Sequence, residues 1–113
     1  MVKLSSSALD RTFAALADPT RRQMLAQLAQ GQTTVTALAA PYAMSLPAVS
    51  KHLRVLEQAG LVHREREGRT HHLRLAAAPL RDAAAWMEAY RTFWNASFDR
   101  LEALLEPPST SEP

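Results

Sequence analysis

The chain has 113 residues and an apolar share of 47%, which is enough for one folded domain with its own core. It contains no cysteine, which excludes disulfides, thiolate metal sites and thiol catalysis and fits a reducing compartment. No run approaches the ~18 uninterrupted apolar residues of a membrane span, and no signal peptide is evident, so we expect a soluble, cytoplasmic protein.

Charge is distributed unevenly along the chain. The net charge is only +2. Residues 51–74 carry six Lys or Arg against three Asp or Glu, whereas residues 75–113 carry three against six. A basic centre followed by an acidic C-terminal third predicts one surface for a polyanion and another for a different partner.

The N-terminal half predicts three helices. Residues 1–7 are expected to form a disordered lead, and apolar residues at helical spacing begin at Ala8. This first helix should end near Asp18, because the residue before a proline avoids helical geometry. Asp18 can then cap a second helix that has Pro19 at its first position. After the turn GQTT, a short third helix is expected, with Thr34 as its cap.

The stretch SLPAVSKHLRVLEQAGLV, residues 45–62, predicts a helix with one face for a core and another for a charged partner. Ser45 can cap its start, and Gly60 can take the left-handed position that closes it. At about 100° per residue, apolar positions converge on one side and polar ones project from the other. The inner positions are Leu46, Val49, Leu53 and Leu56, the outer ones are Pro47, Lys51, Arg54 and Gln58, and Ser50 and His52 lie on the flanks.

The segment LVHREREGRTHHLRL predicts a two-stranded ribbon with a charged tip. Its residues alternate, with Arg64 and Arg66 on one side, and the alternation breaks at Gly68 and Arg69. The ribbon follows a pair of helices joined by a short turn, the arrangement of a helix-turn-helix.

One long helix is expected from about residue 79 to 106, followed by a disordered Pro- and Ser-rich tail, residues 107–113. Its apolar stripe is broad and aromatic, and the helix is longer than a small domain can cover. Part of it should therefore pack, together with the first helix, on a second copy of the chain. The positions expected in this interface are Leu9, Phe13, Trp86, Tyr90, Phe93, Trp94, Phe98 and Leu101.

These elements predict a mainly α fold with a small β-hairpin: a winged helix-turn-helix of about five helices plus a two-stranded wing, spanning residues 8–106. At this point the chain resembles the ArsR-type bacterial transcriptional regulators over roughly residues 9–105. The resemblance rests on FAALADPTRRQMLAQL, on SLPAVSKHLRVLEQAGLV and on REREGRTHHLRL. It implies a homodimeric repressor whose helix from Ser45 enters the major groove of operator DNA while the wing lies beside the phosphates. The matching positions are Ser45, Pro47, Ala48, Ser50, Lys51, His52, Arg54, Arg64, Arg66 and Arg69.

The residue types support this division of roles. Arg and Lys can donate to guanine O6 and N7 in the major groove, which favours Arg54 and then Lys51 as base-reading residues. Ser50 can reach a base edge or a phosphate, and His52 is either a phosphate contact or a satisfied half-buried imidazole. The wing arginines would strengthen binding without reading sequence, unless they only keep the wing soluble.

Metal binding and catalysis are not expected. Many relatives sense metals, but the family's sulfur site falls on VTALAAPYAMS, which lacks cysteine, and its other site falls on residues 80–106, which lack histidine. His71 and His72 are adjacent on a strand and point to opposite faces, which is poor geometry for one ion. No Ser-His-acid spacing, Gly-rich phosphate loop or apolar carboxylate pair indicates an enzyme, and no cofactor is expected.

A second hypothesis is a protein-interaction module that uses the aromatic C-terminal helix and leaves the basic face solvated. A steep salt dependence would favour DNA, since counterion release accompanies phosphate contacts. The sequence leaves open the operator, the regulated genes, repression or activation at each promoter, and any small-molecule or protein inducer.

Overall fold

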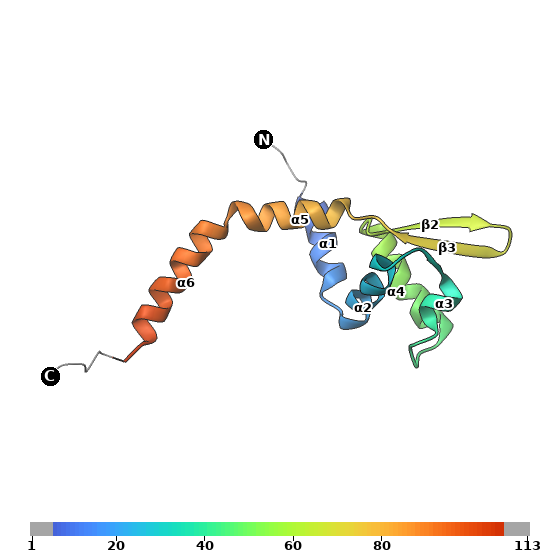
Figure 1. Ribbon diagram of the computed structural model, residues 1–113, viewed down its shortest axis with the longest axis horizontal. Coiled ribbons are helices and arrows are strands. Elements are labelled where there is room, and N and C mark those ends of the chain that lie inside the picture. Colours follow the sequence, from blue (N-terminus) through green and yellow to red (C-terminus); the bar gives the residue numbers. More distant parts are fainter. Residues whose placement is uncertain (1–5, 108–113) are drawn as a thin grey trace. The chain divides into compact units, whose positions relative to one another are not determined.

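The computed structural model describes residues 6–107, which form two compact units: the first ends at Ala83 and the second begins at Ala84. The first unit is a winged helix-turn-helix, as predicted (Figure 1). The elements are α1 (Ser6–Leu16), α2 (Pro19–Ala29), β1 (Thr33–Thr34), α3 (Val35–Ala39), α4 (Leu46–Gln58), β2 (Val62–Glu67), β3 (Thr70–Leu75), α5 (Ala78–Ala89) and α6 (Arg91–Leu105).

The start of α2 confirms the cap expected from the sequence. The Asp18 carboxylate accepts a hydrogen bond of 3.0 Å from the backbone N–H of Arg21, and Pro19 occupies the first helical position. Residues 6 and 7, which were expected to belong to a disordered lead, instead begin α1. Residues 1–5 lie outside the described residues.

Helices α3 and α4 form the helix-turn-helix pair, and α4 is closed at both ends by its own sequence. Ser45 Oγ accepts from the backbone N–H of Ala48 at 3.3 Å. At the other end Gly60 has φ of 76°, and the N–H of Leu61 donates to the carbonyl of Leu56 at 2.9 Å. These bonds satisfy helix-end groups that would otherwise lack partners.

The wing is part of a three-stranded antiparallel sheet with the order β1-β3-β2. Strands β2 and β3 pair from Val62 opposite Leu75 to Glu67 opposite Thr70, and Gly68 turns the chain with φ of 64°. Figure 1 shows the tip of this hairpin extending away from the helices of the first unit. Strand β1 was expected to be part of a turn; with two residues it is too short to show an alternating pattern.

The core of the first unit is formed by leucine and other apolar side chains from α1 to β3. Val49, Leu53 and Leu56 of α4 are at most 1% exposed, as predicted. The prediction for Leu46 was wrong, because its side chain is 61% exposed. Leu46 is the first residue of α4, at the end of the helix that projects beyond the core.

The single long helix expected over residues 79–106 is replaced by two helices, α5 and α6, with Tyr90 between them. The N–H of Tyr90 bonds to the carbonyl of Met87, three residues back, so the helix tightens there instead of continuing its four-residue pattern. Neither Pro nor Gly marks this position, so no sequence signal located the break. The rings of Trp86, Tyr90 and Trp94 are clustered, with centroids 5.3 to 6.0 Å apart.

The second unit leaves its apolar side chains uncovered. No residue of α6 is buried, and Phe93 and Phe98 are 64% and 63% exposed. Of the other residues expected in a dimer interface, Leu9 and Phe13 are half-buried on α1, in the first unit.

Pro107, the first residue of the expected tail, follows α6 outside any helix, and residues 108–113 lie outside the described part of the chain.

The contrast between Leu53 and Leu46 gives a stability test within one helix. Leu53→Ala removes a fully buried side chain and should lower the free energy of unfolding by about 2–5 kcal/mol. Leu46→Ala should change it by less than about 0.5 kcal/mol, since Leu46 is largely in solvent. Denaturant unfolding of both variants measures this, and equal losses would contradict the orientation of α4.

Candidate nucleic-acid interface

The outer face of α4 presents two unpaired cations. Lys51 and Arg54 are exposed, and within the described residues neither side chain forms a hydrogen bond or ion pair. Both lie close to anchored residues, since Lys51 is two positions after the buried Val49 and Arg54 directly follows the buried Leu53. The core therefore fixes the helix backbone, and the two cations are left to contact a partner.

The flanking positions of this face are less accessible. Ala48 and Ser50 are half-buried, whereas Ser45 and Pro47 at the start of the helix are exposed. Small side chains here allow close approach of the α4 backbone to a second surface. The seven sequence-predicted helix positions thus lie together over the start and middle of α4.

Arg64 differs from the other wing arginines because the protein already uses its charge. Its guanidinium donates to both carboxylate oxygens of Glu57, at 3.0 and 2.9 Å, and its Nη1 lies 3.4 Å from Nδ1 of His71. Both side chains of the ion pair are about 30% exposed. Since Glu57 belongs to α4 and Arg64 to β2, this bidentate pair ties the wing to the helix.

Arg66 and Arg69 lie at the turn of the wing, as predicted. Arg66 Nε donates to the carbonyl of Gly68 at 2.9 Å, which holds its side chain along the tip. Arg69 is exposed and makes no hydrogen bond or ion pair within the described residues. Of the three predicted wing residues, Arg69 is therefore the most available to a phosphate.

His52 is held by Arg21 and Asp18 on the inner flank of α4. Its side chain is 21% exposed, and its Nδ1 lies 3.3 Å from Arg21 Nη1 and 3.9 Å from Asp18 Oδ2. Because a guanidinium can only donate, Nδ1 accepts this bond, and a neutral imidazole then carries its proton on Nε2. The structure thus shows a satisfied, half-buried imidazole, and it leaves an Nε2–H donor that a phosphate could accept from.

The same cluster joins α4 to the first two helices. Arg21 Nε and Nη2 donate to the carbonyls of Ala15 and Ala14, at 2.8 and 3.0 Å, and so close the end of α1. The hydrogen bond from the backbone N–H of Arg21, together with the positive charge of the Arg21 side chain, holds the pKa of Asp18 below its ordinary value of 3.8. The capping carboxylate is therefore ionised, as its hydrogen bond to the start of α2 requires.

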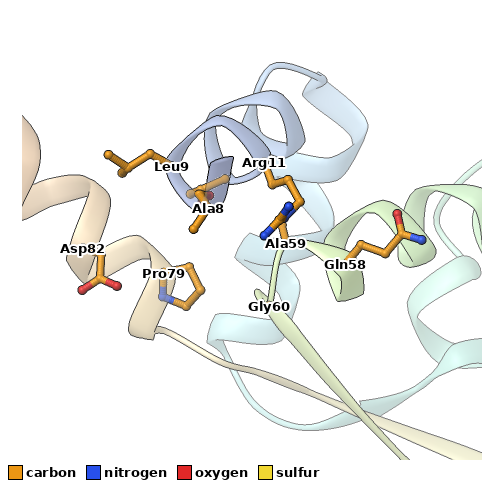
Figure 2. Close-up of a pocket in the computed structure, with 9 residues that line it drawn as sticks. Ala8, Leu9, Arg11, Gln58, Ala59, Gly60, Pro79 and Asp82 are labelled. Atoms are coloured by element: carbon orange, nitrogen blue, oxygen red, sulfur yellow. The ribbon is translucent and has the colours of Figure 1, made fainter. Parts of the chain in front are cut away.

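A cavity of about 280 Å³ lies at the far end of α4, between α1 and the start of α5 (Figure 2). Arg11 and Asp82 stand on its exposed rim, and Pro79 and Ala59 form part of its wall. A helix of this length spans roughly 18 Å, so the cavity is separate from the face at the start of α4. Within residues 6–107, no group of three or more His, Cys, Asp or Glu side chains that could hold a metal ion is found.

The two wing histidines are engaged separately. His71 lies beside Arg64, and His72 Nε2 is 3.3 Å from a carboxylate oxygen of Glu67. This matches the expectation that they point to opposite faces. That metals do not regulate the protein stays a prediction.

Within the described residues, no helix is long and apolar enough to cross a membrane.

The roles of three residues near this surface were not identified from the sequence. Glu57 pairs with Arg64, seven positions away in the chain, and Arg21 pairs with His52, 31 positions away. Residues so far apart in the chain carry no local signal that they will pair. Leu46 was assigned to the core because helical periodicity cannot tell where the core ends along a helix.

Comparisons with known proteins agree with this geometry. The family described as "Bacterial regulatory protein, arsR family" matches residues 18–64. The transcriptional repressor SdpR of Bacillus subtilis (strain 168) is 34% identical over 70% of this chain and 88% of its own length. The crystal structure of the ArsR family transcriptional regulator RHA00566 matches with a TM-score of 0.76 and 36% identity, over 80% of this chain and 93% of that one.

A further match is to a protein whose structure is a homodimer. The homodimeric winged helix-turn-helix DNA-binding domain Mb0332 of Mycobacterium bovis, solved in solution, has a TM-score of 0.59 and 31% identity. The match covers 83% of this chain and 84% of that chain.

The pair Glu57–Arg64 should be measurable as an energetic link between α4 and the wing. Glu57→Ala and Arg64→Ala should each destabilise the fold, and the double variant should lose less than their sum, with a coupling of about 1 kcal/mol. A double-mutant cycle of unfolding free energies tests this, with Glu65→Ala and Arg64→Ala as the control cycle. Additive losses for Glu57 and Arg64 would mean that the ion pair does not hold the wing.

Proposed function

Because the chain belongs to the ArsR family of bacterial transcriptional regulators, we propose that it is a homodimeric repressor that binds an inverted-repeat operator. The observation that carries this proposal is the pair of exposed, unpartnered cations, Lys51 and Arg54, on the anchored outer face of α4 within the described residues. Like its relatives, the chain is a transcriptional regulator and not an enzyme. An operator-binding protein acts in the cytoplasm.

In this proposal, α4 lies in the major groove with its outer face, which carries Lys51 and Arg54, toward the bases. Arg54 offers a planar fork to guanine O6 and N7, and Lys51 offers a single flexible charge. Ser45, Pro47, Ala48 and Ser50 are short enough to let the helix backbone approach the DNA. His52 is assigned to a phosphate through its Nε2–H, because Arg21 occupies Nδ1.

The wing contributes charge outside the groove. Arg69 and Arg66 at the tip are assigned to backbone phosphates, which carry no sequence information. Arg64 is assigned a positioning role, since its guanidinium is bound to Glu57 and sets where the wing lies relative to α4.

The second copy is proposed to cover the apolar residues of the two units. On α6, Phe98, Leu101 and Leu105 follow each other at helical spacing, and Leu101 and Leu105 are 53% and 74% exposed. Leaving so much aromatic and aliphatic surface in water is unfavourable, and a two-fold partner would bury it. Mb0332, a relative of 31% identity, is homodimeric. We assign Leu9, Phe13, Trp86, Tyr90, Phe93 and Trp94 to the same interface, and residues 8–106 to one functional domain.

The protein-interaction hypothesis uses the same apolar surface without DNA. The exposed cations of α4 favour the repressor, because an assembly through α6 gives them no role. The two hypotheses differ in salt dependence, since contacts to phosphates release counterions and apolar contacts do not.

Arg54 and Arg69 should fail differently when each is replaced by alanine. Arg54→Ala should weaken binding to the cognate operator by about 1–3 kcal/mol and change binding to random duplex little, because alanine cannot donate to a base. Arg69→Ala should weaken both duplexes alike and flatten the salt slope by about one unit for each phosphate that the arginine neutralises. Titrations of both variants on both duplexes across a salt series measure this.

A matched control is Arg81→Ala, which removes an exposed arginine from α5, outside the proposed surface. It should leave affinity and salt slope unchanged. If Arg54→Ala weakens random duplex as much as cognate operator, Arg54 does not read a base. If neither Arg54→Ala nor Arg69→Ala changes DNA binding, the repressor proposal is wrong.

The dimer should depend on the apolar stripe of α6. Leu101→Ala, combined with Phe98→Ala, should shift the protein toward monomer at micromolar concentration, because truncating buried apolar side chains costs about 2–5 kcal/mol each. Thr92→Ala, on the polar side of the same helix, should leave the dimer intact. Light scattering of the wild type and both variants decides this, and a monodisperse wild-type monomer would contradict the interface.

A further inference from the structure

Leu46 is exposed at the start of the helix that the proposal places in the groove. Its side chain is 61% exposed, and among the described residues of the first unit it is the one large hydrophobic residue in solvent. Its backbone is fixed, because the Ser45 hydroxyl caps the first turn of α4. A leucine held in water at a defined place has no role in the core beneath it.

Its surroundings point to a partner with both polar and apolar groups. Pro47, the next residue, is exposed as well, so the N-terminal end of α4 presents a small apolar tip. Farther along the same helix, Lys51 and Arg54 are exposed cations without partners in the described residues. A duplex major groove offers this combination, since its base edges carry hydrogen-bond acceptors and one kind of apolar group, the C5-methyl of thymine.

We propose that Leu46 is a specificity-determining residue that recognises thymine through its C5-methyl group. This inference rests on the proposed function and deepens it. A leucine side chain has no donor or acceptor, so it can favour only the base edge that offers apolar surface. Burying the methyl against Leu46 removes apolar surface of both partners from water.

The position of Leu46 also separates its base pair from that of Arg54. The two residues are eight positions apart, which corresponds to roughly 12 Å along an α-helix. Neighbouring base pairs are stacked about 3.4 Å apart, and we therefore assign the two side chains to different base pairs of the half-site. Each half-site should therefore contain a thymine for Leu46 and a separate guanine for Arg54.

The test begins with duplexes that the full-length protein selects from a pool of random sequence. In the strongest duplex, each thymine is replaced in turn by deoxyuridine, which keeps the base pair and O4 and removes only the methyl group. For the wild type, one symmetry-related thymine in each half-site should be sensitive, with affinity falling about fourfold per half-site. Replacing any other thymine should leave the affinity unchanged, or should change it equally for the wild type and for every variant.

Three variants show whether Leu46 is the contact. For Leu46→Ala, replacing the sensitive thymine by deoxyuridine should no longer lower the affinity. The affinity of this variant for the thymine duplex should equal the affinity of the wild type for the uracil duplex. In Leu46→Gln, the uracil effect should also be lost, because an amide can bind adenine N6 and N7 and does not depend on the thymine methyl. Gln58→Ala, an exposed change at the other end of α4, should keep the full uracil effect.

The outcomes separate this inference from the function on which it rests. If the pool yields no preferred duplex, the repressor proposal has failed, and Leu46 has no thymine to read. If a preferred duplex is found but no thymine is sensitive to loss of its methyl, the inference about Leu46 is overturned. It is also overturned if the uracil effect persists undiminished in Leu46→Ala.

Discussion

The burial of one face of α4 is the constraint on which the rest of this molecule depends. Val49, Leu53 and Leu56 are packed into the core of the first unit, so the opposite face of the same helix cannot turn inward. Its cations are thereby held outward at fixed positions, as direct recognition of base edges requires. A flexible loop with the same residues would have to be ordered on binding, at a cost in affinity.

Two polar clusters extend this constraint from the helix to its neighbours. Arg21 joins the end of α1 to His52, and Arg64 joins β2 to Glu57, so one pair holds each side of α4. Both pairs are partly shielded from solvent, where a bidentate or multiply bonded guanidinium keeps its geometry. The wing tip is thus carried at a set position, and the exposed charge of Arg69 is left for phosphates.

Local signals predicted most of the fold, and long-range contacts account for what they missed. Asp18, Ser45 and Gly60 mark helix ends by chemistry that acts within four or five residues, and the structure confirms all three. The outward placement of Lys51 and Arg54 followed from periodicity. The pairing of Arg64 with Glu57, the exposure of Leu46 and the break at Tyr90 did not, because each depends on neighbours in space or on where the core ends.

The most direct test is the affinity of the wild-type protein for its selected duplex and for random duplex at physiological salt. A helix that reads bases through its fixed outer face should prefer the selected duplex by roughly 10³-fold or more, and both affinities should fall steeply as salt rises. Equal affinity for the two duplexes, or binding that salt does not weaken, would contradict the assignment of α4 as a sequence-reading helix.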